Sequence, residues 1–442
     1  MQKRNLLIII LFLFTGTIGW SAERIRQNFD FDWQFRLGEQ GIYKPVQLPH
    51  DWSIELDFNE EVGPESGYLP GGIGYYKKDF NVPASYKGKR VSIVFDGIYH
   101  KATIYLNGQE VDYHRYGYTS FETDLTPYLK YGGKNTLSVK VDHSEKSRWY
   151  TGSGIYRHVW MQVTNPIHVK MWGTYITTPR VSAESAIVSC VTTVANTSAL
   201  TGEIEIMQRI VDAQGNLLKI NGKQYAARTE VVMPENGTKD IAQSFTLSNP
   251  QLWNLEKPYL YRLETILKQK GKVIDRYTTR FGVRTIGFDK DKGFFLNGKN
   301  IKMKGACLHQ DAGCLGVAVP NRSYERRLTI LKEFGANAIR CSHNPPSPEF
   351  LNYCDSIGFL VVDEAFDKWK SGYYEQFFDE CWQQDIRDMI VRDRNHPSIV
   401  LWSIGNELAE ATRKDNVGVE RATLLRDFVH KLEPTRPTML AL

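Results

Sequence analysis

Residues 392–407 read RDRNHPSIVLWSIGNE. A polar turn leads into the short apolar run Ile399–Trp402, and Asn406 and Glu407 follow that run. A strand that is both short and apolar is typical of a parallel sheet covered on both faces. Polar side chains that follow such a strand lie at the carboxyl edge of the sheet, where barrel and doubly wound enzymes carry out their chemistry. We therefore predict that Glu407 is a catalytic carboxylic acid.

An alternation of strand and helix extends over residues 285–442. The predicted strands are residues 301–307, 338–340, 359–362 and 399–402, and the predicted helices are residues 323–334, 348–357, 377–392 and 419–432. Repeated strand–helix units imply a parallel sheet with right-handed crossovers. We predict that this α/β domain is the first half of a (β/α)8 TIM barrel.

Polar side chains gather where these strands end. They are His309 and Asp311 after the first strand, Arg340, Ser342, His343 and Asn344 around the second, Asp363 and Glu364 after the third, and Asn406 and Glu407 after the fourth. Four strand ends that converge on one rim have the layout of a TIM-barrel active site.

The chain before residue 285 predicts two β domains. Residues 23–167 contain many short strands, with a tight hairpin at Asn107-Gly108, and this texture favours a jelly-roll sandwich. Residues 168–284 have the length and strand pattern of an immunoglobulin-like sandwich, and no cluster there suggests chemistry. The whole chain is thus predicted to be a multidomain β plus α/β protein.

Composition and termini narrow the functional class. The net charge of +5 is mild, and no basic run interleaved with aromatic residues indicates a nucleic-acid partner. Residues 1–22 have the basic start and apolar centre of a signal peptide, so we expect an exported protein, periplasmic or extracellular, with no membrane attachment after cleavage. The six cysteines are interpreted as buried small side chains, and one disulfide is left open.

The residue types on the rim favour the cleavage of glycosidic bonds. The chain lacks the GxSxG pattern of serine hydrolases and the HExxH pattern of zinc proteases, and the rim is rich in carboxylates. Glycosidases use one carboxylic acid to protonate the leaving oxygen and a second carboxylate at the sugar carbon. We expect the pKa of Glu407, which follows an apolar strand beside Trp402, to be raised by partial burial or by a neighbouring carboxylate, and Asn406 to bind a sugar hydroxyl.

Two stretches carry a resemblance to a known family. Residues 337–345, NAIRCSHNP, and residues 393–407 resemble the two signature motifs of glycoside hydrolase family 2, which contains β-galactosidases, β-glucuronidases and β-mannosidases. The order of the three predicted domains is also similar to that family, as are residues 48–52, LPHDW, and the region 95–108. The resemblance covers essentially the whole chain after residue 22.

The resemblance implies roles for the rim residues. It makes Glu407 the general acid/base and Asn406 the contact of the sugar 2-hydroxyl, with His309 and His343 at sugar-pocket positions and Arg340 at a pocket-supporting position. Asp311 and Trp402 of the strand ends are predicted to bind substrate as well. Asp363 and Glu364 are similar to the acids of the barrel rim, and an ion pair with Arg340 is the alternative interpretation. A glycoside or oligosaccharide substrate is the implied partner, and assembly into a homo-oligomer is left open.

The sequence departs from the family pattern in two places. Galactosidases that use a metal carry acid and histidine ligands beyond the Asp-Glu pair, where this chain reads FDKWK at 366–370, so we predict no metal and no cofactor. No residue of these 442 matches the family's nucleophile, a glutamate on a later barrel strand. The expected function is β-galactosidase-like retaining hydrolysis, with the nucleophile half of the barrel missing. The alternatives are an inactive carbohydrate-binding protein and a pseudogene product without a folded barrel.

Overall fold

The computed structural model describes residues 23–441, apart from residues 146, 221–222, 371–372 and 409–415. The predicted signal peptide at residues 1–22 lies outside the described residues. In the described part of the chain, no helix is both long and apolar enough to cross a membrane.

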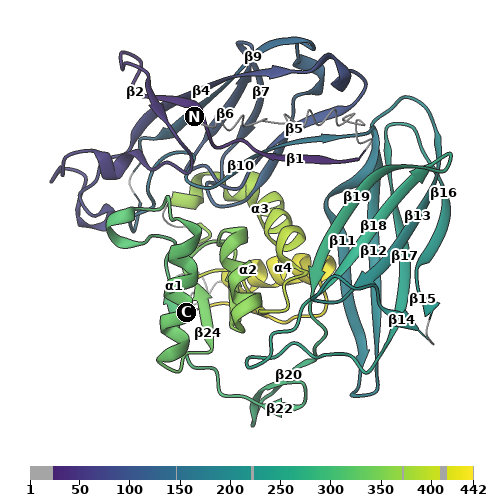
Figure 1. Ribbon diagram of the computed structural model, residues 1–442. Helices are drawn as coiled ribbons and strands as arrows, with labels where there is room; N and C mark the ends of the chain where they lie inside the picture. The colour runs from purple at the N-terminus through teal and green to yellow at the C-terminus, as the bar shows by residue number, and fades with distance from the viewer. Residues whose placement is uncertain (1–22, 146, 221–222, 371–372, 409–415, 442) are drawn as a thin grey trace, which may run out of the picture.

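The first domain is a sandwich of two antiparallel sheets (Figure 1). One sheet has the order β3-β2-β4-β9-β6-β7 and the other the order β1-β10-β5-β8. The hairpin predicted at Asn107-Gly108 joins β6 to β7, and Asn107 has the positive φ of 53° that such turns need. The strands are β1 (Ile25–Asn28), β2 (Trp33–Leu37), β3 (Lys44–Val46), β4 (Gly72–Val82), β5 (Arg90–Phe95), β6 (Ala102–Leu106), β7 (Gln109–His114), β8 (Phe121–Asp124), β9 (Gly133–His143) and β10 (Val159–Thr164).

The second domain is also an antiparallel sandwich. Its sheets have the orders β11-β12-β17 and β16-β13-β18-β19, and β14-β15 form a small hairpin. Alternate residues of β12 and β17 are buried, which is the pattern of sheets that bury one face. The strands are β11 (Ile167–Val181), β12 (Ser185–Asn196), β13 (Gly202–Val211), β14 (Lys219–Ile220), β15 (Lys223–Gln224), β16 (Ala227–Met233), β17 (Gly237–Ser248), β18 (Tyr261–Gln269) and β19 (Lys272–Phe281).

The third domain is half of a TIM barrel, as predicted. A small antiparallel sheet of β20 (Ile286–Asp289), β21 (Gly293–Leu296) and β22 (Lys299–Asn300) precedes it. Its parallel strands are hydrogen-bonded in chain order: β23 (Gly305–Leu308), β24 (Ala338–Cys341), β25 (Leu360–Glu364), β26 (Ile399–Ser403) and β27 (Thr438–Met439). The helices α1 (Asn321–Glu333), α2 (Pro348–Ile357), α3 (Phe378–Asp393) and α4 (Val417–Leu432) connect them.

Local sequence explains where these elements begin and end. The Ser347 hydroxyl caps α2 by accepting from the Phe350 amide, Pro348 takes the first helical position, and Gly358 ends the helix at φ 84°. The first barrel strand was predicted from residue 301, but β23 begins only at Gly305. The amide of Ile301 instead bonds to the carbonyl of Phe294 in the preceding hairpin region, which draws that segment away from the sheet.

The two β domains pack against opposite ends of the barrel strands. Trp253 of the second domain is buried against Ala338, Leu360 and Val400, which lie in the first part of their strands. The first domain contacts the carboxyl edge, where the hydroxyl of Tyr116 donates to the carbonyl of Ala365 at 2.6 Å. The rim that follows the strands therefore faces the first domain (Figure 1).

The cysteines are all reduced. Cys190, Cys341 and Cys354 are buried, as interpreted from the sequence, whereas Cys307 and Cys314 are exposed. None of the six takes part in a disulfide.

Candidate active site

Glu364, the last residue of β25, joins several side chains of the rim. Its fully buried carboxylate accepts from Arg340 Nε at 2.9 Å, Arg340 Nη2 at 2.7 Å and Ser403 Oγ at 2.6 Å. Its other oxygen lies 2.6 Å from Nδ1 of His343. A buried carboxylate needs this many donors because it has lost its hydration. The ion pair with Arg340 is therefore present, and it involves Glu364.

Asp363 has different surroundings, because successive side chains of a strand point to opposite faces. It lies buried near Asp393, whose carboxylate is held by two bonds of 2.7 Å from Arg392. Burial, together with the charge of Asp393, raises the pKa of Asp363 well above its ordinary range. Asp363 thus belongs to the packing between the strands and helices and not to the rim.

Asn406 is held between strand β24 and the loop that follows β25. Its side-chain oxygen accepts from Arg340 Nη2 at 2.8 Å, and its amide nitrogen donates to Asp367 Oδ1 at 2.8 Å. The side chain is almost fully buried, at 3% exposed. The side chain of Asn406 therefore has a fixed orientation beside Glu407.

Glu407 stands at the open side of the rim. It adopts a positive φ of 46°, and such strained conformations cluster at functional sites. Its side chain is 61% exposed, and Oε2 is 2.9 Å from Arg148 Nη2 and 3.2 Å from Lys368 Nζ. The bond from Lys368 and the charges of Lys368 and Arg148 lower the pKa of Glu407.

This result overturns the expectation that the pKa of Glu407 is raised. The sequence suggested partial burial beside Trp402, but Glu407 is exposed and faces two cations. Both cations lie far from Glu407 in sequence, so the local motif gave no signal of them.

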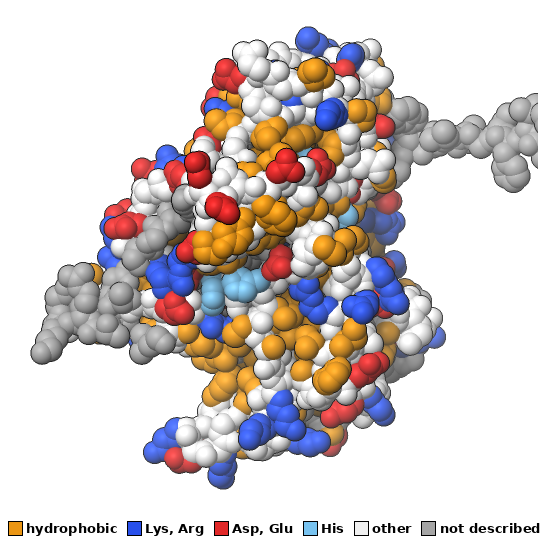
Figure 2. All heavy atoms as spheres, turned by 90° about the vertical axis from the view of Figure 1, so that its left-hand side faces the viewer, with side chains coloured by type: hydrophobic (Ala, Val, Ile, Leu, Met, Phe, Trp, Pro, Cys, Tyr) orange, Lys and Arg blue, Asp and Glu red, His pale blue; other side chains and the backbone are white. Residues whose placement is uncertain are grey.

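Two histidines and a tryptophan form one wall of the site. The ring centroids of His309 and His343 are 5.4 Å apart, and Trp149 of the first domain lies 5.3 Å from His309 and 5.7 Å from His343. Burial and the neighbouring His343 lower the pKa of His309, which favours its neutral form. Figure 2 shows histidine side chains in a hollow of the surface, beside lysine and arginine side chains.

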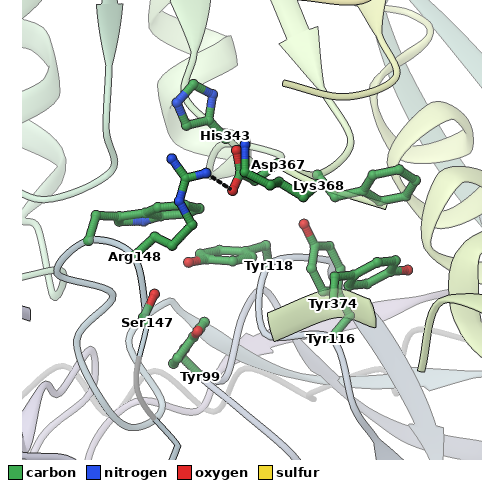
Figure 3. A pocket seen from close by; sticks show the side chains of 11 residues that line it. Tyr99, Tyr116, Tyr118, Ser147, Arg148, His343, Asp367, Lys368 and Tyr374 are labelled. Atoms are coloured by element: carbon green, nitrogen blue, oxygen red, sulfur yellow. Dashed lines mark hydrogen bonds and ion pairs between the residues drawn. The ribbon is translucent and has the colours of Figure 1, made fainter. Parts of the chain in front are cut away.

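A pocket lies beside this wall, where the first domain meets the barrel. Figure 3 shows Arg148 and His343 on one side of it and four tyrosines on the other, with an ion pair drawn from Arg148 to Asp367. The tyrosines are Tyr99, Tyr116 and Tyr118 of the first domain and Tyr374 of the barrel domain. The site is therefore built by two domains.

Of the predicted substrate contacts, Trp402 does not face this site, whereas the charge of Asp311 acts on His309 in its wall. Trp402 is fully buried, and its indole nitrogen donates to Glu433 at 3.0 Å, so it packs in the core and cannot stack on a sugar. Asp311 accepts from the amide of Gly313 at 3.3 Å within its own loop. The structure brings together His309, Arg340, His343, Asn406 and Glu407, whose roles toward a sugar stay predictions.

Sequence reasoning missed the residues that surround Glu407 from outside its own motif. Arg148 and Trp149 come from the loop between β9 and β10, and Asp367 and Lys368 follow β25 directly. The position of Asp367 after a barrel strand was a usable signal. Arg148 carried none, because no motif in its part of the first domain marks it as a neighbour of the barrel rim. Within the described residues, no cluster of three or more His, Cys, Asp or Glu side chains could hold a metal ion.

Three family models match the chain in succession. The sugar binding domain of glycosyl hydrolases family 2 matches residues 30–166, the family's central model matches residues 167–284, and its TIM barrel domain matches residues 289–441. The chain belongs to glycosyl hydrolase family 2. The predicted family and the predicted fold class are both confirmed.

Relatives in this family include enzymes named for two sugars. The chain is 44% identical over 436 residues to the beta-galactosidase BoGH2A of Bacteroides ovatus, which covers 93% of this chain and 50% of that protein. It is 36% identical to a putative beta-glucuronidase of Formosa agariphila, covering 99% of this chain and 42% of that protein. The chain thus spans about half the length of the curated relatives it matches.

Solved structures agree with this assignment. A family 2 glycosyl hydrolase from Bacteroides cellulosilyticus superposes with a TM-score of 0.89 at 39% identity, covering 94% of this chain and 56% of that one. A beta-glycosidase from Bacteroides vulgatus superposes with a TM-score of 0.85 at 37% identity, covering 94% and 54% of the two chains.

Proposed function

We propose that the rim carries the acid/base half of a retaining β-glycosidase active site that acts on terminal β-galactosides. The observation that carries this proposal is the position of Asn406-Glu407 directly after β26, joined through Arg340 to Glu364 and His343. The choice of a galactoside is supported by the 44% identity to a protein named beta-galactosidase.

The geometry suits a proton donor that is reached from solvent. The carboxyl group of Glu407 is exposed, so the oxygen of a glycosidic bond can approach it. Asn406 is held by Arg340 and Asp367, and its amide is thereby positioned beside the acid to contact a sugar hydroxyl. The Glu364 network keeps Arg340 and His343 in place during these steps.

A retaining reaction also needs a second carboxylate about 5–5.5 Å from the acid. Among the described residues, Glu364 and Asp367 are the carboxylates hydrogen-bonded to other residues of this site. Both already accept hydrogen bonds from several side chains. Glu364 accepts from Arg340, Ser403 and His343, and Asp367 accepts from Arg148 and Asn406. We therefore expect the 442-residue chain, by itself, not to hydrolyse nitrophenyl β-galactoside. Turnover above that of the Glu407→Gln variant would contradict this.

Aryl β-galactosides with graded leaving groups test the donor role of Glu407. In any preparation that hydrolyses them, Glu407→Gln should reduce the rate far more for poor leaving groups than for activated ones, since only poor leaving groups require the proton. Equal losses on both would remove Glu407 from the acid role.

Carbohydrate binding without turnover is the second candidate function. It is favoured by the two cations on Glu407, which hold the carboxyl group in its ionised form. Calorimetric titration with methyl β-D-galactoside tests the binding that both functions require. The series of graded leaving groups separates them, because only the first function predicts a preparation in which Glu407 protonates the leaving oxygen. No binding by a folded chain would exclude both functions for these residues.

Export is proposed from residues 1–22 alone. Fractionation of cells that express the whole chain should recover it outside the cytoplasm and shortened at its amino end. Recovery of the uncleaved chain in the cytoplasm would contradict this proposal.

A further inference from the structure

One guanidinium connects two carboxylates of the barrel. Arg148 belongs to the first domain, yet its Nη1 lies 2.9 Å from Asp367 Oδ2 and its Nη2 lies 2.9 Å from Glu407 Oε2. Asp367 follows β25 and Glu407 follows β26, so this single side chain joins two barrel loops to the first domain. Figure 3 shows the pair with Asp367.

The charges around Glu407 oppose its proposed role in the free protein. Lys368 and Arg148 contact its carboxylate, His343 is the next titratable group, and Asp367 lies on the far side of Arg148. Both contacts favour the ionised form. A general acid must instead hold a proton before it can donate one. At least one contact must therefore change before Glu407 acts as a donor.

The two contacts of Arg148 differ in how easily they can be replaced. The Glu407 side chain is 61% exposed and the Asp367 side chain is 11% exposed, while that of Arg148 is 41% exposed. Ion pairs that face water contribute little, because water competes for both charges. Asp367 is also held by Asn406, so Arg148 can release Glu407 and still keep a fixed anchor.

We propose that Arg148 is a positioning residue that exchanges partners. In the free protein it holds Glu407 against Asp367, and in the sugar complex its Nη2 donates to a sugar hydroxyl while Nη1 stays on Asp367. Glu407 thereby loses one neighbouring cation at the moment a glycosidic oxygen arrives. This inference rests on the proposed role of Glu407 as the acid of a sugar site.

Carbon-13 NMR of the 442-residue chain tests the first half of this inference without any need for turnover. The glutamate carboxyl groups are labelled, and the Glu407 resonance is assigned as the one missing from Glu407→Gln. In Arg148→Met this resonance should titrate at higher pH than in the unchanged protein. Arg148→Lys should fall between them, because an ammonium carries the charge but lacks the planar fork that spans both carboxylates.

Arg115→Met is the matched control. Arg115 is another arginine of the first domain that pairs with a barrel carboxylate, Glu380, at 3.0 Å, and its side chain is 37% exposed. This variant should leave the Glu407 titration unchanged. A Glu407 titration in Arg148→Met that equals the unchanged protein would overturn the proposal.

Titration with saturating methyl β-D-galactoside tests the exchange itself. The sugar should move the Glu407 titration to higher pH in the unchanged protein and leave it where it stands in Arg148→Met. An equal upward shift in both proteins would show that the sugar acts without Arg148, which refutes the exchange. A sugar that perturbs no resonance in either protein would instead refute the proposed sugar site, and with it the exchange, while the comparison without sugar would still report the resting contact.

Discussion

The Nη2 atom of Arg340 donates to the side-chain oxygen of Asn406 across 2.8 Å, although the two residues are 66 positions apart in the chain. This bond decides which end of the Asn406 amide faces Arg340 and which end faces Asp367. The orientation of a group beside the proposed acid is therefore set by an arginine two strands away. The same arginine also neutralises Glu364.

Arg340→Met should destabilise the chain strongly. It leaves the carboxylate of Glu364 fully buried without its cation, and breaking a buried ion pair in this way costs about 3–5 kcal/mol. We expect urea unfolding to show a loss of about 3 kcal/mol in the free energy of unfolding. This value is at the lower end of that range because the Arg340 side chain is 19% exposed. The control is Arg209→Met in the second domain. Arg209 pairs with Glu264, which is 30% exposed, so this variant should lose less than about 1 kcal/mol in the free energy of unfolding. Similar losses in both variants would contradict the buried pair.

Glutamate-to-glutamine changes should affect stability differently at the two rim carboxylates, because Glu364 is buried and Glu407 is exposed. Glu407→Gln should alter the free energy of unfolding by less than about 0.5 kcal/mol, because the group is exposed. Glu364→Gln makes the same chemical change at a fully buried site that accepts from Arg340 and Ser403, and it should cost about 2–3 kcal/mol. Urea unfolding of both variants checks this, and a larger loss for Glu407→Gln would reverse the assignment.

The two tryptophans near the rim should behave in opposite ways. Trp402→Phe removes the indole donor to buried Glu433 and should cost about 1–3 kcal/mol of stability while leaving galactoside affinity unchanged. Trp149→Ala removes a ring that faces His309 and His343, so it should weaken galactoside binding in a calorimetric titration. Unchanged affinity in Trp149→Ala would place the sugar elsewhere.

The stability that Asp363 contributes to the folded state should decrease as pH rises. Burial first, and the charge of Asp393 next, raise its pKa well above the ordinary value of 3.8, so the folded chain keeps a proton that the unfolded chain releases. Its contribution is complete below pH 3.8 and is lost as pH rises toward the pKa of the folded state.

Asp363→Asn cannot ionise, so it should gain stability relative to the unchanged chain as pH increases. Urea unfolding at several pH values between about 4 and 8 measures this difference. Other buried acids, such as Asp388 with a pKa raised to about 7, titrate in both proteins and cancel in the comparison. Asp427→Asn, an exposed position on α4, is the control, and a pH-independent difference for Asp363→Asn would contradict the argument.

Strand and helix positions in the barrel could be predicted because each depends on a local pattern. The apolar run that ends at Trp402 predicted β26, and the apolar side chains Phe350, Leu351 and Cys354 predicted α2. The side of a strand on which a residue lies could not be predicted in the same way. A strand buried on both faces shows no alternation, so nothing in the run distinguished the core-facing Trp402 from a rim residue.

The electrostatics of Glu407 were beyond the reach of a local motif for a second reason. Its partner Arg148 is 259 positions away, in the first domain, where no local pattern links it to the barrel motif. Only the packing of the first domain on the carboxyl edge of the barrel brings the two charges together. The motif singles out Glu407 as the proposed acid, whereas the proton affinity of its carboxyl group depends on the tertiary structure.

The site is built from residues of two domains, and this has a consequence for how such proteins diversify. The loop that holds Arg148 and Trp149 ends before β10, and the first domain as a whole ends before β11. A chimera that exchanges residues 23–166 would inherit new neighbours for Glu407 while every barrel residue stays the same. The protonation of Glu407 would then change with the exchanged domain, without any mutation of the barrel domain that contains it.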